Sequence, residues 1–303
     1  MTIQEALDKF LRQLGTERNM APSTVEAYRY ELGRWSEHVA LHDPKCLANV
    51  AKVDPFNLKD YLARLREERN CKPATIARVI SSLRQFFSFL AAEGIVGVDP
   101  AAGLRTPKKS RKLPIYLTAG EANRLAAPLP KEGETDDDDR LRDETIIALL
   151  MLTGMRLAEL VGLDVGSIDF ENSVAKVFGK GRKERLIPLN SSAQELLREW
   201  MAHRPAGRDG CQALFLSRER DRISRRTVQH VVKKAARHNG LDRRISPHKL
   251  RHTFATTLYA EAVDLRDIQE LLGHASVVST SVYTHTNVDK VRAAVNKLKI
   301  RGG

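Results

Sequence analysis

The chain has 303 residues, of which 42% are hydrophobic and 29% are charged, as is typical of a globular protein large enough for two domains. Its net charge of +12 is spread along the chain and favours a polyanionic partner. The three cysteines are scattered and no apolar run has membrane-spanning length, which argues against a disulfide framework, a zinc site and a membrane span. We therefore expect a soluble protein of the reducing cytoplasm.

The first hundred residues have helical patterns of apolar residues and predict a four-helix domain. The predicted helices begin at, or directly after, residues that favour helix starts: Thr2, Ser23, Pro55 and Pro73. The first two starts have a glutamate three positions further on, as a capping box requires, and Gly94 ends the fourth helix. Three arginines lie off the apolar stripes and are candidates for contact with the polyanion: Arg29, Arg78 and Arg84.

The segment from residue 99 to 114 has three prolines and no apolar periodicity, which predicts an interdomain linker. We place the linker at residues 105–115, between a helical domain of residues 1–104 and a second domain of residues 116–303. Its five basic residues are Arg105, Lys108, Lys109, Arg111 and Lys112. They could be solvated or could lie along a phosphate backbone, and the positive total charge favours the second alternative.

The second domain combines helices with a short β-hairpin. Thr118 and Glu121 form a capping box, and residues 141–152 read as a buried helix. Residues 174–178 and 184–189 are strand-like and are joined by a glycine-containing turn, whereas the chain is mainly helical after Ser192. The sequence therefore predicts a mostly α protein with a small β-sheet, and an α+β second domain.

Four consecutive aspartates, Asp136 to Asp139, precede the buried helix. They lack the alternate-residue spacing and the glycine of a calcium loop, so a cation site is not indicated. We expect a solvated acidic loop, which is the usual environment of a run of like charges.

Arg156 follows Gly154 and precedes Glu159 by three positions. It could be a structural arginine paired with Glu159, or a phosphate clamp whose guanidinium Glu159 holds in place. His248 and Arg251 follow Pro247, which fits the first helical position and would place both side chains on one face of the first turn. A phosphate beside that turn would also meet free backbone N–H groups.

Three further positions complete a set that could cut a phosphodiester. Lys180 lies in the glycine-flanked turn, where a mobile ammonium could protonate a leaving oxygen. Arg182 and Lys183 follow it, and Lys183 could take the same role. His274 and Tyr283 could be an ordinary helix histidine and a core tyrosine. A phenol attacks phosphorus well only in a positive field, which clustered arginines would provide.

The whole set resembles the tyrosine recombinase (phage integrase) family, and the Xer subgroup in particular. The resemblance is carried by residues 153–160, 179–189, 246–252 and 271–274, by residues 21–28, and by six positions in the family's order and spacing: Arg156, Lys180, His248, Arg251, His274 and Tyr283. It implies a SAM-like core-binding domain, a catalytic domain with a C-terminal tail, and a clamp around double-stranded DNA. The arginines and lysines named above become candidate DNA contacts.

The resemblance further implies site-specific DNA recombination through a 3′-phosphotyrosyl intermediate and a Holliday junction, without metal, ATP or other cofactor. Tyr283 would be the nucleophile, Lys180 the general acid and His248 the proton acceptor, while the two arginines and His274 would hold the phosphate. The expected partners are a specific DNA site and a homo-tetramer or hetero-tetramer, and the expected location is the nucleoid. The expected task is Xer-type dimer resolution; the alternatives are a mobile-element integrase, an inactive DNA-binding relative and a type IB topoisomerase.

Overall fold

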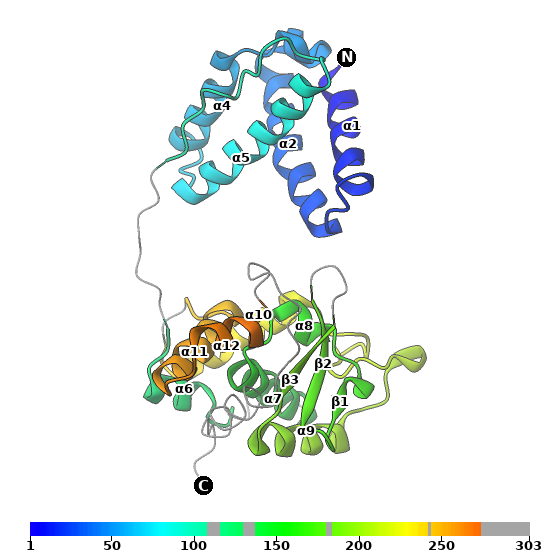
Figure 1. Ribbon diagram of the computed structural model, residues 1–303, viewed down its shortest axis with the longest axis vertical. Coiled ribbons are helices and arrows are strands. Elements are labelled where there is room, and N and C mark those ends of the chain that lie inside the picture. The colour runs from blue at the N-terminus through cyan, green and yellow to red at the C-terminus, as the bar shows by residue number, and fades with distance from the viewer. Residues whose placement is uncertain (108–115, 130–136, 180–183, 242–243, 274–303) are drawn as a thin grey trace. The chain divides into compact units, whose positions relative to one another are not determined.

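The computed structural model describes residues 1–107, 116–129, 137–179, 184–241 and 244–273 (Figure 1). The chain forms two compact units, Met1–Leu113 and Pro114–Gly303. The described residues are mostly helical with one three-stranded sheet, which confirms the predicted fold class. None of the helices in these ranges is both long and apolar enough to span a bilayer.

Among its described residues, the regular secondary structure of the first unit is all helical. Its α-helices are α1 (Ile3–Thr16), α2 (Pro22–His42), α3 (Pro44–Ala48), α4 (Pro55–Glu67) and α5 (Pro73–Ala92), with a 3₁₀ turn at Val50–Lys52. The capping box of Thr2 and Glu5 is present, and prolines occupy the first turns of α4 and α5 as predicted. The core of the unit is built around large rings that pack edge to face: Phe10, Trp35, Phe86 and Phe87.

Two details of the first unit differ from the sequence prediction. The helix predicted to open at Ser23 begins one residue earlier, because Pro22 occupies its first turn and Ala21 caps it without a side-chain hydrogen bond. Glu26 is therefore not part of a capping box, and its carboxylate lies 3.4 Å from Nε of Arg29. The short helix α3 was not predicted; the Asp43 side chain caps it by accepting a hydrogen bond from the backbone of Cys46.

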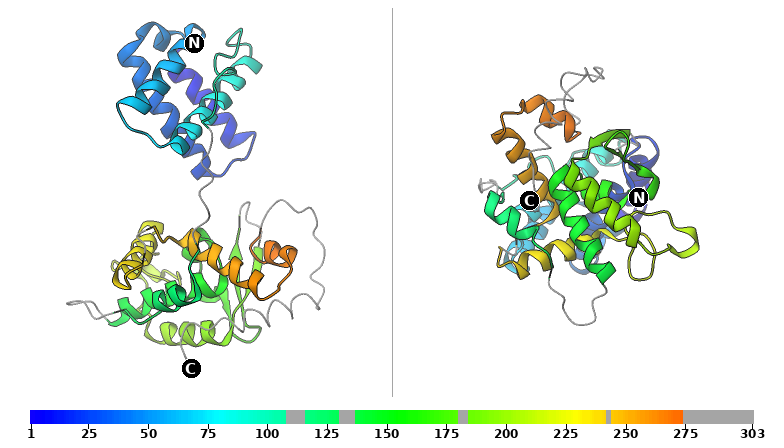
Figure 2. Two further views of the ribbon diagram at one scale, coloured as in Figure 1. Left: turned by 90° about the vertical axis from the view of Figure 1, so that its left-hand side faces the viewer. Right: turned by 90° about the horizontal axis from the view of Figure 1, so that it is seen from below.

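The second unit packs its helices around α7. The α-helices are α6 (Ala119–Leu125), α7 (Asp137–Thr153), α8 (Leu157–Val161), α9 (Ser191–His203), α10 (Arg225–His238), α11 (Pro247–Ala260) and α12 (Leu265–Leu271), with 3₁₀ turns at Val165–Ser167 and Arg208–Gly210. Helix α7 runs through the core, and α9, α10 and α11 pack against it (Figure 1 and Figure 2). The residues from Thr145 to Thr153 are all buried, so the second half of α7 lacks the polar face of a surface helix.

The sheet has the strand order β1-β2-β3 and is antiparallel. Strands β2 (Val174–Phe178) and β3 (Glu184–Pro188) form the predicted hairpin, in which Val177 lies opposite Arg185 and Ala175 opposite Ile187. Strand β1 (Ile168–Asp169) is an addition that its two residues were too few to signal. The turn that carries Lys180, Arg182 and Lys183 lies outside the described residues.

The prediction of a solvated acidic loop is wrong for Asp137, Asp138 and Asp139, which form the first turn of α7. Negative side chains are favoured at a helix N-terminus, where unpaired backbone N–H groups point outward. Asp139 is also an ion-pair partner, at 2.5 Å from Nη1 of Arg142 and 3.1 Å from Nε of Arg218. The acidic run therefore anchors the start of the central helix.

Candidate active site

The site begins at the sharp turn between α7 and α8. Gly154 has φ +58°, and a Cβ at this position would overlap the ring of Phe254 on α11. Only glycine combines that backbone conformation with so close an approach of a neighbouring helix. The turn brings Arg156 to the N-cap position of α8, with Glu159 three residues further on in its first turn.

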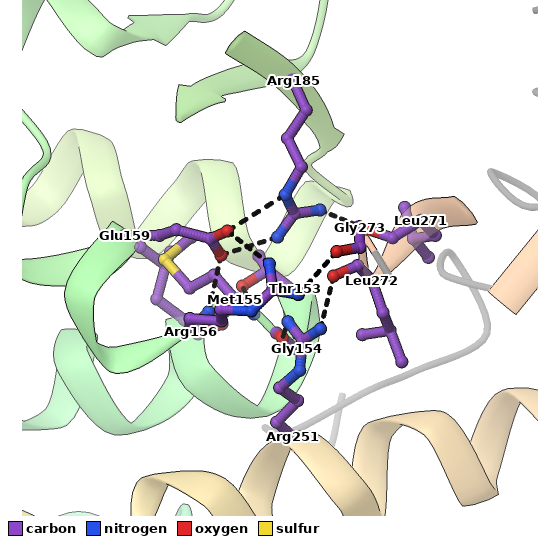
Figure 3. A network of polar contacts seen from close by, with 11 residues as sticks. Thr153, Gly154, Met155, Arg156, Glu159, Arg185, Arg251, Leu271, Leu272 and Gly273 are labelled. Atoms are coloured by element: carbon purple, nitrogen blue, oxygen red, sulfur yellow. Dashed lines mark hydrogen bonds and ion pairs between the residues drawn. The ribbon is translucent and has the colours of Figure 1, made fainter. Parts of the chain in front are cut away.

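Glu159 is the acceptor at the centre of the site, and its side chain is almost completely buried (Figure 3). Its Oε1 accepts from Nη1 of Arg156 at 2.9 Å and from Nε of Arg185 at 3.2 Å. Its Oε2 accepts from the backbone N–H of Arg156 and from Nη2 of Arg185, both at 2.7 Å. Burial opposes ionisation, but the hydrogen bonds from Arg185 and Arg156 outweigh it and lower the pKa of Glu159 below 4.5.

Arg251 reaches the same place from α11. Pro247 occupies the first turn of that helix, as predicted, and the Arg251 side chain is buried. Its Nη1 donates to the carbonyl of Gly154 at 2.7 Å, and its Nη2 donates to the carbonyl of Leu272. Burial, together with repulsion from Arg156 and Arg185, lowers the pKa of Arg251 to about 10. Its guanidinium is therefore still charged at neutral pH.

Three guanidiniums meet at the C-terminal end of α12, and we call Arg156, Arg185 and Arg251 the guanidinium cluster (Figure 3). They donate in turn to three successive backbone carbonyls: Arg185 to Leu271, Arg251 to Leu272 and Arg156 to Gly273, the last at 2.6 Å. The carbonyl end of a helix is electronegative, which makes it a natural partner for cations. The cluster thus joins α8, β3, α11 and α12 around one small volume of positive charge.

The predicted site residues are placed unequally. The structure brings Arg156, Glu159 and Arg251 together, although α11 and α8 are far apart in the sequence. His248 is exposed on the first turn of α11, three positions before Arg251. The other predicted residues of the site lie outside the described residues: Lys180, His274 and Tyr283. The structure describes two residues next to them in the sequence: Gly179 directly precedes Lys180, and Gly273 directly precedes His274.

Arg185 also belongs to the cluster, although its sequence pattern predicted only a strand residue. A signal was present. Arg185 and Ile187 are two positions apart in β3, and Arg185 lies opposite Val177 in β2. The three side chains therefore share the inward face of the sheet, where Ile187 and Val177 are buried. A charged side chain on an inward face needs a partner, and that requirement could have pointed to Glu159.

The candidate DNA contacts of the first unit have varied surroundings. Arg78 lies 2.5 Å from the buried carboxylate of Glu31, Arg29 is close to Glu26, and Nη2 of Arg84 donates to the carbonyl of Leu104. The remaining candidate in the described part of the linker, Arg105, is exposed. The other linker and turn candidates lie outside the described residues: Lys108, Lys109, Arg111, Lys112, Arg182 and Lys183. Within the described ranges, no three histidine, cysteine, aspartate or glutamate side chains are arranged to hold a metal ion.

Comparison with known proteins identifies both parts of the chain. Residues 116–290 match the phage integrase family, and residues 7–94 match the phage integrase N-terminal SAM-like domain. The chain is 39% identical to tyrosine recombinase XerC of Shewanella amazonensis over 280 residues, which cover 92% of this chain and 90% of that protein.

Solved structures share the fold. The XerH site-specific recombinase bound to palindromic difH substrate in a post-cleavage complex gives a TM-score of 0.69 at 24% identity, covering 96% of this chain and 83% of that one. A lambda integrase tetramer bound to a Holliday junction gives a TM-score of 0.66 at 20% identity, covering 93% of this chain and 80% of that one.

Proposed function

The chain belongs to the phage integrase family of tyrosine recombinases, enzymes that cleave and rejoin DNA at specific sites, and we propose that it does so with Tyr283 as nucleophile. The observation that carries the proposal is the convergence of Arg156 and Arg251 at one point, where a phosphate could be held between them. Each guanidinium has five N–H donors, so each can keep its carbonyl partner and still donate to a non-bridging oxygen.

The proposed cleavage step conserves the energy of the bond it breaks. The Tyr283 oxygen attacks phosphorus and forms a 3′-phosphotyrosyl ester, while the bond to the 5′-oxygen breaks. Lys180 supplies the proton that this leaving oxygen takes up, and His248 accepts the phenol proton. A 5′-hydroxyl from the partner duplex then attacks the phosphotyrosine, which releases Tyr283 and joins the exchanged strands. No nucleotide or metal ion is consumed.

The charge of the site supports transition-state stabilisation. Within the contacts described above, two guanidiniums share one carboxylate, that of Glu159, and the third, that of Arg251, donates to backbone carbonyls, so the site is positive where a phosphate would enter. The phosphoryl group gains negative charge during the attack, and fixed donors in a partly dry site stabilise that charge without reorganising. We propose that Arg156 and Arg251 bind the two non-bridging oxygens and that His274 donates a further hydrogen bond.

We further propose an Xer-type task, the resolution of dimeric chromosomes, for which the similarity to XerC is the support. Residues 1–104 would be the core-binding domain, residues 105–115 a linker along the DNA, and residues 116–303 the catalytic domain. The active assembly would be a homo- or hetero-tetramer on two DNA duplexes in the nucleoid. A mobile-element integrase would use the same site, and the recognised DNA sequence decides between the two tasks.

Covalent capture tests the function and finds the DNA site in one experiment. The purified chain is incubated with sheared, randomly nicked genomic DNA of its source, denatured in detergent, and the attached DNA is sequenced. We expect one enriched sequence with the wild-type chain and none with Tyr283→Phe, although this variant should still bind DNA. A trapped adduct in the variant would refute the assignment of Tyr283. Binding without any adduct from the wild-type chain would indicate an inactive relative.

The topoisomerase alternative is separated by the product. A plasmid with two copies of the captured sequence should yield recombinant circles. Relaxation of supercoils without exchange between the copies would indicate a type IB topoisomerase instead, because that class rejoins the strand it has cut.

A further inference from the structure

We propose that Arg185 is a positioning residue for DNA cleavage, which holds Glu159 and the end of α12 so that Arg156 faces the phosphate in one orientation. This role rests on the proposed function of the site. It assigns to the hairpin a second contribution besides the one proposed for Lys180, and it places a third arginine in the machinery of the reaction.

The contacts of Arg185 link three elements through one side chain. Its Nε and Nη2 donate to the two oxygens of Glu159 at 3.2 and 2.7 Å, and its Nη1 donates to the carbonyl of Leu271. The side chain is 16% exposed, so water competes little for these bonds. Because Glu159 also holds Arg156, any movement of Arg185 is passed on to the guanidinium that we expect to bind phosphate.

Close packing at Gly273 shows how little freedom the arrangement leaves. Gly273 has φ +64°, and a Cβ there would lie 3.2 Å from Cδ of Arg185 and 3.3 Å from Nη1 of Arg156. The end of α12 therefore rests directly on the two guanidiniums, and the chain continues from Gly273 into His274. Holding α12 on Arg185 fixes the position of Gly273, the residue that precedes His274 in the sequence.

The forked guanidinium explains why an arginine is needed. Two donors engage one carboxylate while a third reaches a carbonyl on another element, which the single ammonium of lysine cannot do with the same geometry. The positive charge of Arg185 also repels Arg251, whose pKa is lowered in part by it. An arrangement selected only for stability would avoid gathering three cations when two of them share one carboxylate and the hydrogen bonds described for the third go to carbonyls, whereas a phosphate in the site would balance them.

The test measures cleavage and binding separately in the full-length chain. The substrates are nicked duplexes of the sequence recovered by covalent capture, with either an ordinary 5′-oxygen or a 5′-sulfur at the cut. Single-turnover adduct formation gives the rate, and fluorescence anisotropy gives the affinity. For Arg185→Ala we expect adduct formation about 100-fold slower, the usual consequence of a misplaced catalytic group, with DNA affinity changed by less than about threefold.

Two further variants separate positioning from charge and from folding. Arg185→Lys keeps the charge and should regain less than about a tenth of the lost rate, because the fork is absent. The matched control is Arg222→Ala, since Arg222 also binds one carboxylate, that of Asp164, and two carbonyls, those of Val161 and Leu163, but lies outside the guanidinium cluster. Its removal should leave the rate of adduct formation close to the wild-type value.

The sulfur substrate shows through which group Arg185 acts. A sulfur leaving group needs no general acid, so it relieves defects at Lys180 but not at the phosphate-binding arginines. Arg185→Ala should slow both substrates alike, and combining it with Glu159→Gln should slow cleavage little more than either change alone.

Each of four results would overturn the proposal: wild-type cleavage by Arg185→Ala, full recovery with lysine, rescue by sulfur, or equal slowing by Arg222→Ala. If the wild-type chain itself forms no adduct, the proposed function fails, and with it this role.

Discussion

The substitution Glu159→Gln tests the centre of the site most directly, because it removes charge with almost no change in shape. Each oxygen of Glu159 accepts two hydrogen bonds, one from the backbone or side chain of Arg156 and one from Arg185. A glutamine keeps one acceptor oxygen and turns an N–H₂ group toward the other pair of donors. Whichever way the amide lies, two hydrogen bonds are lost and the guanidiniums have no counter-charge.

The size of the effect follows from those contacts. Breaking a buried ion pair by neutralising one partner costs about 3–5 kcal/mol. Arg156 is 39% exposed, and water can compensate it in part, so the lower end, about 3 kcal/mol in the free energy of unfolding, is expected. For a unit of this size the melting temperature should fall by about 6–12 °C.

Urea unfolding of the full-length chain can report on the second unit alone. The chain has two tryptophans, Trp35 in the core of the first unit and Trp200 in the core of the second. In a Trp35→Phe background, the fluorescence of Trp200 therefore follows the unit that contains the site. The matched control is Glu184→Gln, which neutralises an exposed carboxylate 3.0 Å from Lys176 on the same hairpin and should cost less than about 1 kcal/mol.

The pH dependence gives an independent check. The folded-state pKa of Glu159 is lowered, so its contribution is complete above its usual value of 4.5 and is lost as pH falls through the folded value. The difference in unfolding free energy between the wild-type chain and Glu159→Gln should be constant from about pH 7 to 5.5 and should narrow below 4.5. The reasoning is refuted if Glu159→Gln destabilises the unit no more than Glu184→Gln, or if the difference grows in acid.

Three other predictions concern the turn, the general acid and metal independence. Gly154→Ala should cost about 2–5 kcal/mol, from its positive φ and the overlap with Phe254, whereas Gly120→Ala, with open space around it, should be neutral or slightly stabilising in the same urea assay. Lys180→Ala should slow cleavage of an ordinary strand by about 10²–10⁴-fold and that of a 5′-sulfur strand much less; equal slowing would exclude Lys180 as the acid. Adduct formation should persist in excess EDTA, and its loss there would indicate a metal-dependent nuclease.

Local chemistry made much of the fold predictable. The capping boxes at Thr2 and Thr118 and the proline at the start of α11 define helix starts through contacts within one turn, which a linear sequence records. Where local signals competed, the prediction was wrong. Helix α2 begins at Pro22 and not at Ser23. Three aspartates that were predicted to lie in a loop, because they form a run of like charge, belong to the first turn of α7.

The sequence by itself predicted which chemical groups this protein uses for its reaction, and six residues in a family's order and spacing indicated a tyrosine recombinase without coordinates. Only the tertiary structure decided how two of them are held. It placed Arg156 and Arg251 on three successive carbonyls at the end of α12 together with Arg185, and it gave Glu159 two guanidiniums to hold. The physical reason is that capping is a contact within one helical turn, whereas the guanidinium cluster depends on side chains from α8, β3 and α11 reaching a fourth element, and no local spacing encodes that distance.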